Sequence, residues 1–344
     1  MLLHGWLLEW WRHYGDGGAL RVYVAYRDGR LVGALPLCVR TQSGLRVLTF
    51  LGGAHSALAD LLVAPREDLA TAQALARRVS DSQHDFADLF GLPGDSLLAR
   101  ALGGTKLRLV ERGEAPVLDL EGSWKEVYEA KLSSKKRAQN RRRKRNLAKL
   151  GTIEVVLART KEELAPALED AFALHELRWN GRPDGSDFAT PAGRHFHRAA
   201  LLALSESDVP RIVTLKVDGR PAAFHYFFAL EGRMYVHRMG FDPAFAQVSP
   251  GWLNTLDTIE LAAAEGLTRV EFLGGAERYK RELADRFEPL YEGFGLAGSL
   301  RGAAAARARV SAIELRKRLK RSETLRRFYF DGLAPARRFA GRFT

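Results

Sequence analysis

The sequence predicts an α+β protein built from two copies of one unit. Two pairs of apolar, strand-like runs are each joined by an Asp-Gly turn, at Asp28-Gly29 and at Asp218-Gly219, 190 residues apart. Asp-Gly between β-type runs is a strong β-hairpin signal. Each hairpin is followed by a third strand, a proline-containing loop, a helix and another strand. The shared order at a nearly constant offset indicates a duplication; two unrelated hairpin–helix–strand units are the alternative.

The elements of both copies follow from period-2 and period-3.6 patterns of apolar residues. In the first copy we expect a hairpin in Leu20–Val39, a strand at Leu45–Leu51, a helix at Asp68–Val79 and a strand at Phe86–Gly91. In the second copy we expect a strand at Thr152–Ala158, helices at Lys161–Trp179 and Arg194–Ser205, a hairpin in Pro210–Leu230, a strand at Arg233–Met239, a helix at Trp252–Glu265 and a strand at Arg269–Gly274.

The composition is that of a globular chain with large cores. The 344 residues suggest two domains, 46% of them are hydrophobic, and no apolar run reaches the roughly 18 residues of a membrane span. The first 15 residues lack a basic leader, so we do not expect a signal peptide. Cys38 is the only cysteine, which excludes an internal disulfide and a cysteine-built zinc site. We expect a cytoplasmic enzyme without a metal.

The net charge of +12 is concentrated in two segments. Lys131–Lys149 carries ten basic residues and no acidic one, and Ser299–Thr344 carries thirteen basic and three acidic residues. The rest of the chain is mildly acidic. The two segments are either solvated charged faces or surfaces for an anionic membrane or RNA. The tail mixes leucines and phenylalanines with its arginines, which suits a peripheral membrane helix or a helix that docks on the body.

The segment Ser249-Pro250-Gly251 stands where the second amphipathic helix begins. Ser249 is a good N-cap, Pro250 suits the first helical position, and Gly251 has no side chain to obstruct a ligand. A helix start has unpaired N–H groups and favours negative charge. The segment therefore suits either an ordinary cap or a phosphate cradle.

Several short motifs, spaced as in one known family, carry a resemblance. They are WLLEWW (Trp6–Trp11), VGALPL (Val32–Leu37), FLGG (Phe50–Gly53), RRRKRNLAKLG (Arg141–Gly151), LHELRW (Leu174–Trp179), SPG (Ser249–Gly251) and EFLGGAERYK (Glu271–Lys280). With the order of elements, they make the chain resemble GNAT-superfamily acyltransferases, in detail the CelD-like (cellulose-biosynthesis-type) acetyltransferase domain. More distantly the chain is similar to the Fem-type aminoacyltransferases that build peptidoglycan cross-bridges.

The resemblance implies two tandem GNAT-like units, each a mixed twisted sheet flanked by helices. We expect a degenerate N-terminal unit at 1–122, a basic connecting helix at 123–150, an acyltransferase unit at 151–298 and a basic helical tail at 299–344. From the resemblance we expect the first unit to lack the opening strand and helix of its relatives. Its helix start carries Glu67 and Asp68, which would repel a phosphate, so the second unit is the expected cofactor site.

The resemblance places acyl-CoA on the turn before the Trp252–Glu265 helix. QVSPGW replaces the glycine-rich loop of ordinary GNAT enzymes, so this expectation rests on position. The cofactor-binding candidates are Gln247, Val248, Ser249, Gly251, Trp252 and Asn254.

The catalytic candidates are Tyr279, Lys280, His237 and Glu271. The resemblance implies that Tyr279 protonates a departing thiolate and that Lys280 neutralises an oxyanion or the phosphates. His237 and Glu271 are candidate bases, and strand alternation predicts that His237 shares a face with Tyr235 and Met239.

The acceptor-binding candidates are His175, Arg178, Trp179 and His225. Each histidine is alternatively a structural residue, and a solvated helix start is the alternative for the GGAERYK segment. The absence of a nearby cysteine predicts direct transfer rather than a covalent enzyme intermediate.

The predicted activity is transfer of an acetyl or acyl group from acyl-CoA to an amine or hydroxyl of a small molecule or glycan. The resemblance implies a role in cell-envelope or exopolysaccharide biosynthesis. We expect the protein in the cytoplasm or at the inner face of the membrane, without a DNA partner. A Fem-type transferase that uses aminoacyl-tRNA and a non-catalytic envelope-assembly protein are the alternatives.

Overall fold

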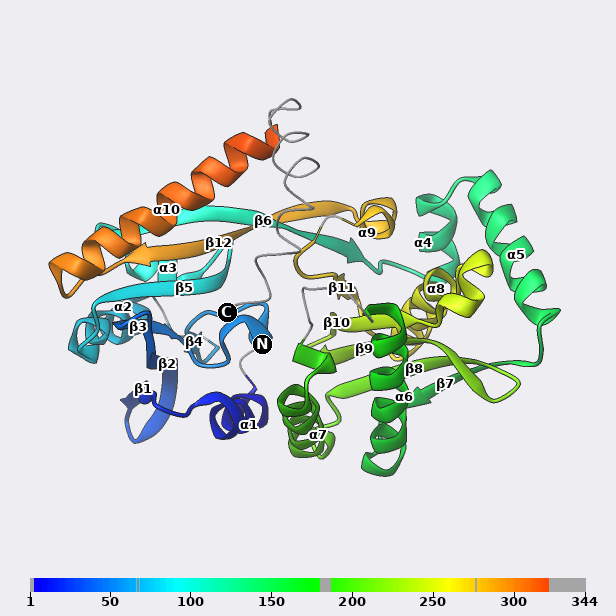
Figure 1. Cartoon of the computed structure of the whole chain (residues 1–344), viewed down its shortest axis with the longest axis horizontal. Helices are drawn as coiled ribbons and strands as arrows, with labels where there is room; N and C mark the ends of the chain where they lie inside the picture. The colour runs from blue at the N-terminus through cyan, green and yellow to red at the C-terminus, as the bar shows by residue number, and fades with distance from the viewer. Residues whose placement is uncertain (1–2, 66, 68, 180–186, 276, 322–344) are drawn as a thin grey trace, which may run out of the picture.

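The described residues, 3–65, 67, 69–179, 187–275 and 277–321 of the computed structural model, form one mixed 12-stranded β-sheet flanked by helices (Figure 1). The strand order is β1-β2-β3-β5-β12-β6-β11-β10-β9-β8-β7, with β4 paired to β2 outside this path. This is the α+β class that the sequence predicts.

The N-terminal half contains α1 (His4–Tyr14), β1 (Ala19–Arg27), β2 (Arg30–Gln42), β3 (Leu45–Phe50), the 3-10 helix η1 (Gly53–Ser56), β4 (Leu62–Val63), α2 (Leu69–Arg77), η2 (Arg78–Ser82), β5 (Phe86–Pro93), α3 (Leu97–Ala101) and β6 (Leu107–Asp119). The rest contains α4 (Trp124–Lys131), α5 (Ser134–Ala148), β7 (Ile153–Ala158), α6 (Lys161–Trp179), η3 (Asp187–Ala189), α7 (Pro191–Ser205), β8 (Pro210–Val217), β9 (Arg220–Leu230), β10 (Arg233–Phe241), η4 (Pro243–Val248), α8 (Pro250–Ala264), β11 (Arg269–Glu271), α9 (Arg278–Leu283), β12 (Arg286–Gly295) and α10 (Leu300–Arg321).

Both Asp-Gly hairpins form as predicted. Asp28 and Gly29 have φ of 49° and 74°, and Asp218 and Gly219 have φ of 48° and 73°. Two consecutive positive φ angles match the right-handed twist of the flanking strands, and Asp-Gly reaches this conformation at low cost.

The two halves repeat one topology. In each half an antiparallel hairpin (β1–β2 or β8–β9) continues into a third antiparallel strand (β3 or β10). That third strand then pairs in parallel with the strand after the helix, β3 with β5 and β10 with β11. The parallel pairing is short in both halves, so the two strands diverge soon after they meet. This supports the predicted duplication.

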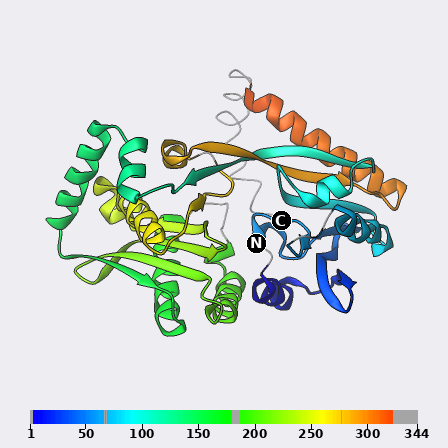
Figure 2. The same cartoon turned by 180° about the vertical axis from the view of Figure 1, so that it is seen from behind.

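The halves are joined through β6 and β12, which run between them in both views (Figures 1 and 2). Strand β6 pairs with β12 along its length and with β11 at its C-terminal end. Strand β12 lies within the predicted second unit, 151–298, but it is inserted between β5 and β6 of the N-terminal half. The sheet is therefore continuous.

Helix α1 packs on the C-terminal half. Trp6, which is 0% exposed, lies in a core cluster with Phe172 of α6, Phe196 of α7 and Phe228 of β9. The centroid of the Trp6 ring is 4.7 Å from that of Phe196. The WLLEWW motif thus contributes to the core of the unit that follows it.

The predicted basic connecting helix is two helices. Ser123 and Glu126 form a capping box at the start of α4, and the Ser133 hydroxyl accepts a hydrogen bond from the backbone N–H of Lys136 at the start of α5. Leu132 between them is extended and buried, with φ of −117° and ψ of 125°. Its burial anchors the break against the sheet.

Helix α10 is the described part of the basic tail, and it docks on the N-terminal half. Ala306, Val310 and Ile313 pack in one buried cluster with Phe86 of β5 and Phe294 of β12. The predicted apolar tail residues Leu325, Phe328 and Phe330 lie outside the described residues. Among the described residues, no helix has the length and apolar composition needed to cross a bilayer.

Several predicted boundaries are wrong; the helix expected to begin at Arg194, for example, begins at Pro191. The last core strand, expected at Arg269–Gly274, ends at Glu271 because the chain leaves its partner β6 there. The helix expected to begin at Trp252 begins at Pro250, which occupies the first helical position as the proline rule requires.

A buried pair of carboxylates, Asp88 and Glu292, lies near α10. The Arg309 guanidinium pairs with Asp88, and Arg112 Nε lies 2.8 Å from Glu292 Oε2. Burial, followed by the hydrogen bond and charge of Asp88, raises the pKa of Glu292 from 4.5 to about 7. The folded state thus binds a proton that the unfolded chain releases between these two pH values.

We predict that the stability of the wild type relative to Glu292→Gln falls as pH rises from about 5 to about 8. The raised carboxyl pKa contributes stability that is complete below pH 4.5 and is lost as pH rises through the folded value of about 7. Thermal midpoints measured across this range check the slope. Glu111→Gln, a change at an exposed position on β6, is the control. If the difference in thermal midpoint from the wild type changed with pH equally in both variants, the raised pKa could not be assigned to Glu292.

Candidate active site

The divergence of β10 from β11 creates a cavity between the halves. The two strands pair only over Arg233–Tyr235 and Arg269–Glu271. Strand β10 then has a bulge between Val236 and Arg238 and continues to Phe241, whereas β11 ends. A bulge bends its strand and increases its twist, which opens the gap.

The cavity has a volume of about 480 Å³. Its walls come from both halves of the chain: Ala54, His55, Ala57 and Phe90 from the N-terminal half, and His175, Val236, His237, Arg238, Met239, Phe272, Leu273, Gly274, Glu277, Tyr279, Lys280 and Leu290 from the rest. A largely apolar concave site with a few converging polar groups is the usual form of a small-molecule site.

Lys280 lies in the wall of this cavity and is 5% exposed. Its ammonium Nζ donates to the carbonyl oxygen of Gly274 at 2.8 Å and lies 3.1 Å from Glu277 Oε2. Burial lowers the pKa of Lys280, an effect that the Glu277 carboxylate opposes. The site therefore holds one buried cation in a fixed orientation.

Tyr279 precedes Lys280 on α9 and also lines the cavity. Its ring packs against Phe272, with centroids 6.2 Å apart. The loop before α9 contains Leu273 at a φ of 55°, a left-handed conformation that is rare for a leucine. This loop turns the chain so that Gly274, Tyr279 and Lys280 converge on one space.

His237 lies at the β10 bulge and is enclosed by aromatic rings. Ring centroids of Tyr226, Trp6, His197 and Phe228 lie 5.1 to 5.3 Å from that of His237. Burial, followed by the charge of Arg238, lowers the pKa of His237 well below its ordinary value. The imidazole is therefore neutral at physiological pH, the form that accepts a proton.

Strand alternation fails at the bulge. Tyr235 pairs with Phe228, on the face where His237 lies, whereas Met239 pairs with His225 on the other face. The prediction that His237 and Met239 share a face is therefore wrong, because the bulge adds a residue between them.

His225 lies on β9 behind the cavity wall and is fully buried. Burial, and then the positive charge of Lys280, lowers its pKa to about 3. Neither ring nitrogen has a hydrogen-bond partner among the described residues. His225 is thus a neutral neighbour of Lys280, and it does not line the cavity.

Glu271 is separated from the other three catalytic candidates. It is 4% exposed, its carboxylate lies 2.6 Å from Arg269 Nε and 3.5 Å from Arg233 Nη1, and it does not line the cavity. Burial raises its pKa, and the Arg269 guanidinium opposes this shift. The structure thus brings together Tyr279, Lys280 and His237, without Glu271.

Sequence analysis missed His55 and Arg238. His55 belongs to the N-terminal half, and its Nδ1 accepts a hydrogen bond from Trp10 Nε1 at 3.1 Å. That bond places the ring proton on Nε2. His55 lies in the loop after the third strand of the first copy. The corresponding strand of the second copy carries His237, and this correspondence could have identified His55 as a candidate. Arg238 is the residue after the predicted catalytic candidate His237. Its place in the cavity wall depends on the bulge in β10, which the sequence did not predict.

The turn predicted to hold a phosphate is partly covered. Ser249 has a left-handed φ of 53° and its side chain makes no capping hydrogen bond, so the predicted N-cap role of its hydroxyl is wrong. Pro250 and Gly251 are buried. A Cβ on Gly251 would lie 3.1 Å from Phe241 Cδ1, so a methyl group here would require the Phe241 ring to shift slightly.

The other predicted cofactor residues have varied surroundings. Gln247 is exposed and Val248 is buried. Trp252 Nε1 donates to Asn140 Oδ1 of α5 at 2.8 Å, and the Asn254 side-chain amide donates to the carbonyl oxygen of Val213 at 3.2 Å. Trp252 and Asn254 therefore have structural partners.

Among the predicted acceptor residues, His175 lines the cavity and is 3% exposed. Arg178 and Trp179 belong to the last turn of α6, and their side chains lie outside the described residues.

The cavity brings together the buried ammonium of Lys280, the phenol of Tyr279 and the imidazole of His237. Such groups can stabilise negative charge on an oxygen, donate a proton to a leaving group and accept one from a nucleophile. The described residues contain no cluster of three metal-ligating side chains.

Comparisons with known proteins agree with this fold. Residues 134–281 match the family model described as an acetyltransferase (GNAT) domain. No curated protein matches the sequence.

Solved structures resemble most of the chain. FemX is 11% identical with a TM-score of 0.58, covering 86% of this chain and 91% of that one. L-PGS from Bacillus licheniformis is 14% identical with a TM-score of 0.54, covering 88% and 95%. A tandem GNAT protein from the clavulanic acid biosynthesis pathway is 12% identical with a TM-score of 0.50, covering 86% and 89%. At these identities the likeness establishes the tandem GNAT fold and no substrate.

We predict that Gly251→Ala destabilises the protein by about 1–3 kcal/mol, because its methyl group must displace the Phe241 ring. The same change in a Phe241→Leu background should cost less, since a smaller side chain leaves room. Denaturant unfolding of the four proteins of this double-mutant cycle measures the coupling. Additive effects would show that the Gly251–Phe241 contact does not explain the glycine.

Proposed function

We propose that the protein transfers an acyl group from an acyl-CoA thioester to an amine or hydroxyl, with the cavity between β10 and β11 as its active site. The observation that carries the proposal is the convergence of Lys280, Tyr279 and His237 at the divergence of two parallel strands. The GNAT domain match over residues 134–281 supports it, because that segment supplies all three side chains.

The chemistry assigns one task to each group. The acceptor's nitrogen or oxygen attacks the thioester carbonyl carbon and forms the new bond, and the carbon–sulfur bond breaks as the negative charge passes from oxygen to sulfur. Lys280 stabilises the developing oxyanion, Tyr279 donates its proton to the thiolate, and neutral His237 accepts the proton of the acceptor. The burial of Lys280 strengthens its effect on charge, since the local dielectric is low.

The acceptor side of the cavity is built by the N-terminal half. His55, Ala57 and Phe90 contribute to its wall. We infer that the first unit has a supporting role in acceptor recognition, and that the substrate is a small molecule or glycan used in cell-envelope or exopolysaccharide synthesis. The structural likeness of FemX and L-PGS is compatible with this assignment but is not evidence of a shared substrate.

The test is calorimetric titration with acetyl-CoA, followed by an assay of free thiol release with amine and hydroxyl acceptors. We predict that Lys280→Met lowers kcat by about 10²–10³, the usual effect of removing an oxyanion donor. Tyr279→Phe should lower kcat while leaving acetyl-CoA binding unchanged. Lys149→Met, an exposed lysine near the end of α5, is the control. Absence of acetyl-CoA binding at millimolar concentration would refute the CoA-dependent proposal.

Gly251→Ala then tests the predicted phosphate turn, once its packing effect is known. In the Phe241→Leu background, a loss of acetyl-CoA affinity at unchanged stability would place the pyrophosphate near Gly251. Unchanged affinity would remove the turn from the CoA site.

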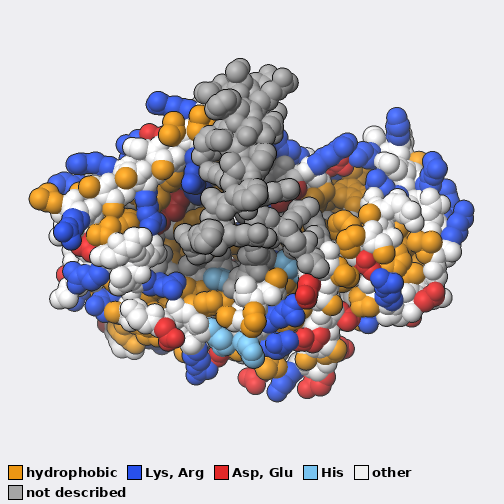
Figure 3. Space-filling view, viewed as in Figure 1, with side chains coloured by type: hydrophobic (Ala, Val, Ile, Leu, Met, Phe, Trp, Pro, Cys, Tyr) orange, Lys and Arg blue, Asp and Glu red, His pale blue; other side chains and the backbone are white. Residues whose placement is uncertain are grey.

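A second candidate is a transferase that uses aminoacyl-tRNA. The observation that favours it is the exposure of Arg141, Arg142 and Arg145 on α5. Figure 3 shows basic side chains at the edge of the molecule where α5 lies in Figure 1. Other cations of α5 are already paired inside the protein, Lys136 with Glu282 and Lys144 with Asp257.

The tRNA candidate predicts binding that weakens steeply with salt, because bound cations displace counterions from the phosphates. Replacing the three arginines by alanine should reduce both affinity and the salt slope. Binding of tRNA without any acetyl-CoA binding would favour this candidate over the first.

A further inference from the structure

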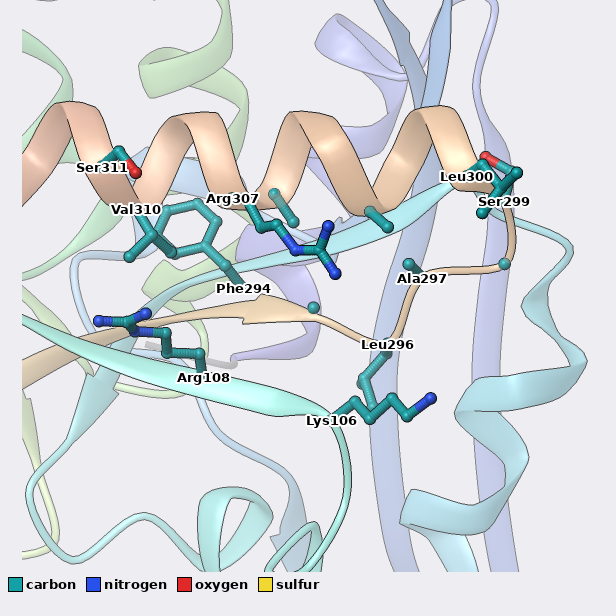
Figure 4. A pocket seen from close by; sticks show the side chains of 14 residues that line it. Lys106, Arg108, Phe294, Leu296, Ala297, Ser299, Leu300, Arg307, Val310 and Ser311 are labelled. Carbon is teal, nitrogen blue, oxygen red and sulfur yellow. The ribbon is translucent and has the colours of Figure 1, made fainter.

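A second and larger cavity lies on the other end of β12, away from the candidate active site. It has a volume of about 860 Å³ and lies between α10 and strands β6 and β12 (Figure 4). Leu290 of β12 contacts the candidate active site, whereas Phe294 of the same strand lines this second cavity. The two sites therefore share no lining residue.

Helix α10, one wall of the second cavity, is held at two points. At its start, Ser299 Oγ donates to Asp85 Oδ1 at 2.8 Å and accepts from the backbone N–H of Gly302 at 3.0 Å. Further along, Arg309 pairs with Asp88 of β5.

Two of the lining residues between these anchors are small. Ala303 and Ala306 line the cavity, and neither side chain extends beyond a methyl group. Helix α10 contacts the strands through Ala306 and Val310, which pack with Phe86 and Phe294, and the cavity lies beside this contact.

The apolar wall of the cavity is formed by Phe294, Leu296 and Val310. Leu300 also lines it and is 92% exposed, an unusual position for a leucine on an ordered helix. Phe294 and Val310 are themselves buried, so the apolar surface that a ligand could cover comes from Leu300 and the half-buried Leu296.

The rim of the cavity is cationic. Arg108 reaches it from β6, Lys106 from the residue just before that strand, and Arg307 extends from α10 toward the strands (Figure 4). Arg108 pairs with Glu314, but Lys106 and Arg307 form no ion pair with the described residues. The described lining residues include no carboxylate. The unbalanced positive charge favours an anion.

We propose that this cavity binds an amphipathic anion, a molecule with one apolar chain and a terminal carboxylate or phosphate. The chain occupies the space between α10 and β12, and the acidic head lies between Lys106 and Arg307. An inorganic anion would gain only a screened interaction with exposed cations. A neutral apolar molecule would cover the wall but leave the charges at the rim without a partner.

The test is calorimetric titration of the full chain with decyl phosphate and decanoate below their micellar concentrations, with decanol and inorganic phosphate as comparison ligands. We expect binding of one or both amphipathic anions and much weaker binding of decanol and phosphate. The phosphate and carboxylate arms distinguish a lipid-phosphate head from a fatty-acid head. Equal affinity for decanol, or for inorganic phosphate, would overturn the proposal, and so would binding of neither anion.

Two variants address the two parts of the site separately. Lys106→Glu combined with Arg307→Glu should weaken decyl phosphate or decanoate by about tenfold or more, whichever binds. Ala303→Phe should abolish binding by filling the cavity, with a thermal midpoint at or above that of the wild type.

Arg301→Glu is the matched control, since Arg301 is exposed on α10 and does not line the cavity. Unchanged affinity in the charge-reversed variant, or an equal loss in the control, would show that binding occurs elsewhere. The charge variants keep the test decisive should Ala303→Phe fail to fold.

Discussion

The pairing of β6 with β12 is the interaction on which the rest of the structure depends. Strand β6 spans Leu107–Asp119 and carries β12 on one side and β11 on the other. Val117 lies opposite Glu271 of β11 and Arg286 of β12, so a single point in β6 sets both registers. Because a one-residue slip would reverse every side chain of a strand, this register fixes which residues face each cavity. The candidate active site and the α10 cavity are both consequences of it.

In the candidate active site, the protonation of the side chains depends more on their burial than on their residue type. Lys280 and His237 would be ordinary titrating groups on the surface, but the enclosing rings and strands disfavour their charged forms. The same effect keeps His225 neutral beside Lys280. Side chains with shifted pKa values that converge in a cavity are characteristic of functional sites. Glu271 also has a shifted pKa, but it is paired with Arg269 outside the cavity, as in a structural ion pair.

The two basic segments have different physical roles. In α5 several cations neutralise carboxylates of neighbouring helices, and only part of the row remains exposed. In α10 one arginine is an anchor, Arg309, and another, Arg307, faces an open cavity. Counting charges does not distinguish these residues. Their positions do: Arg309 holds α10 in place, whereas Arg307 is available to a ligand in the cavity. FemX, L-PGS and the tandem GNAT protein share this fold, so the function of the chain has to be argued from the positions of its own side chains.

The sequence alone determined the local elements and their duplication. Asp28-Gly29 and Asp218-Gly219 form hairpin turns because the required φ angles are a property of those two residues. Periodicity likewise predicted α6 at Lys161–Trp179. Tyr279 and Lys280 were candidates through the resemblance to GNAT and Fem-type enzymes, and their catalytic roles stay predictions.

Only the tertiary structure decided the long-range partners. The insertion of β12 beside β5, the packing of Trp6 against Phe196 and the entry of His55 into the cavity join residues far apart in the chain. The bulge at His237 and the left-handed Ser249 also escaped prediction. Local patterns specify which face of a segment is apolar, but the surface that covers that face is chosen by the packing of the whole chain.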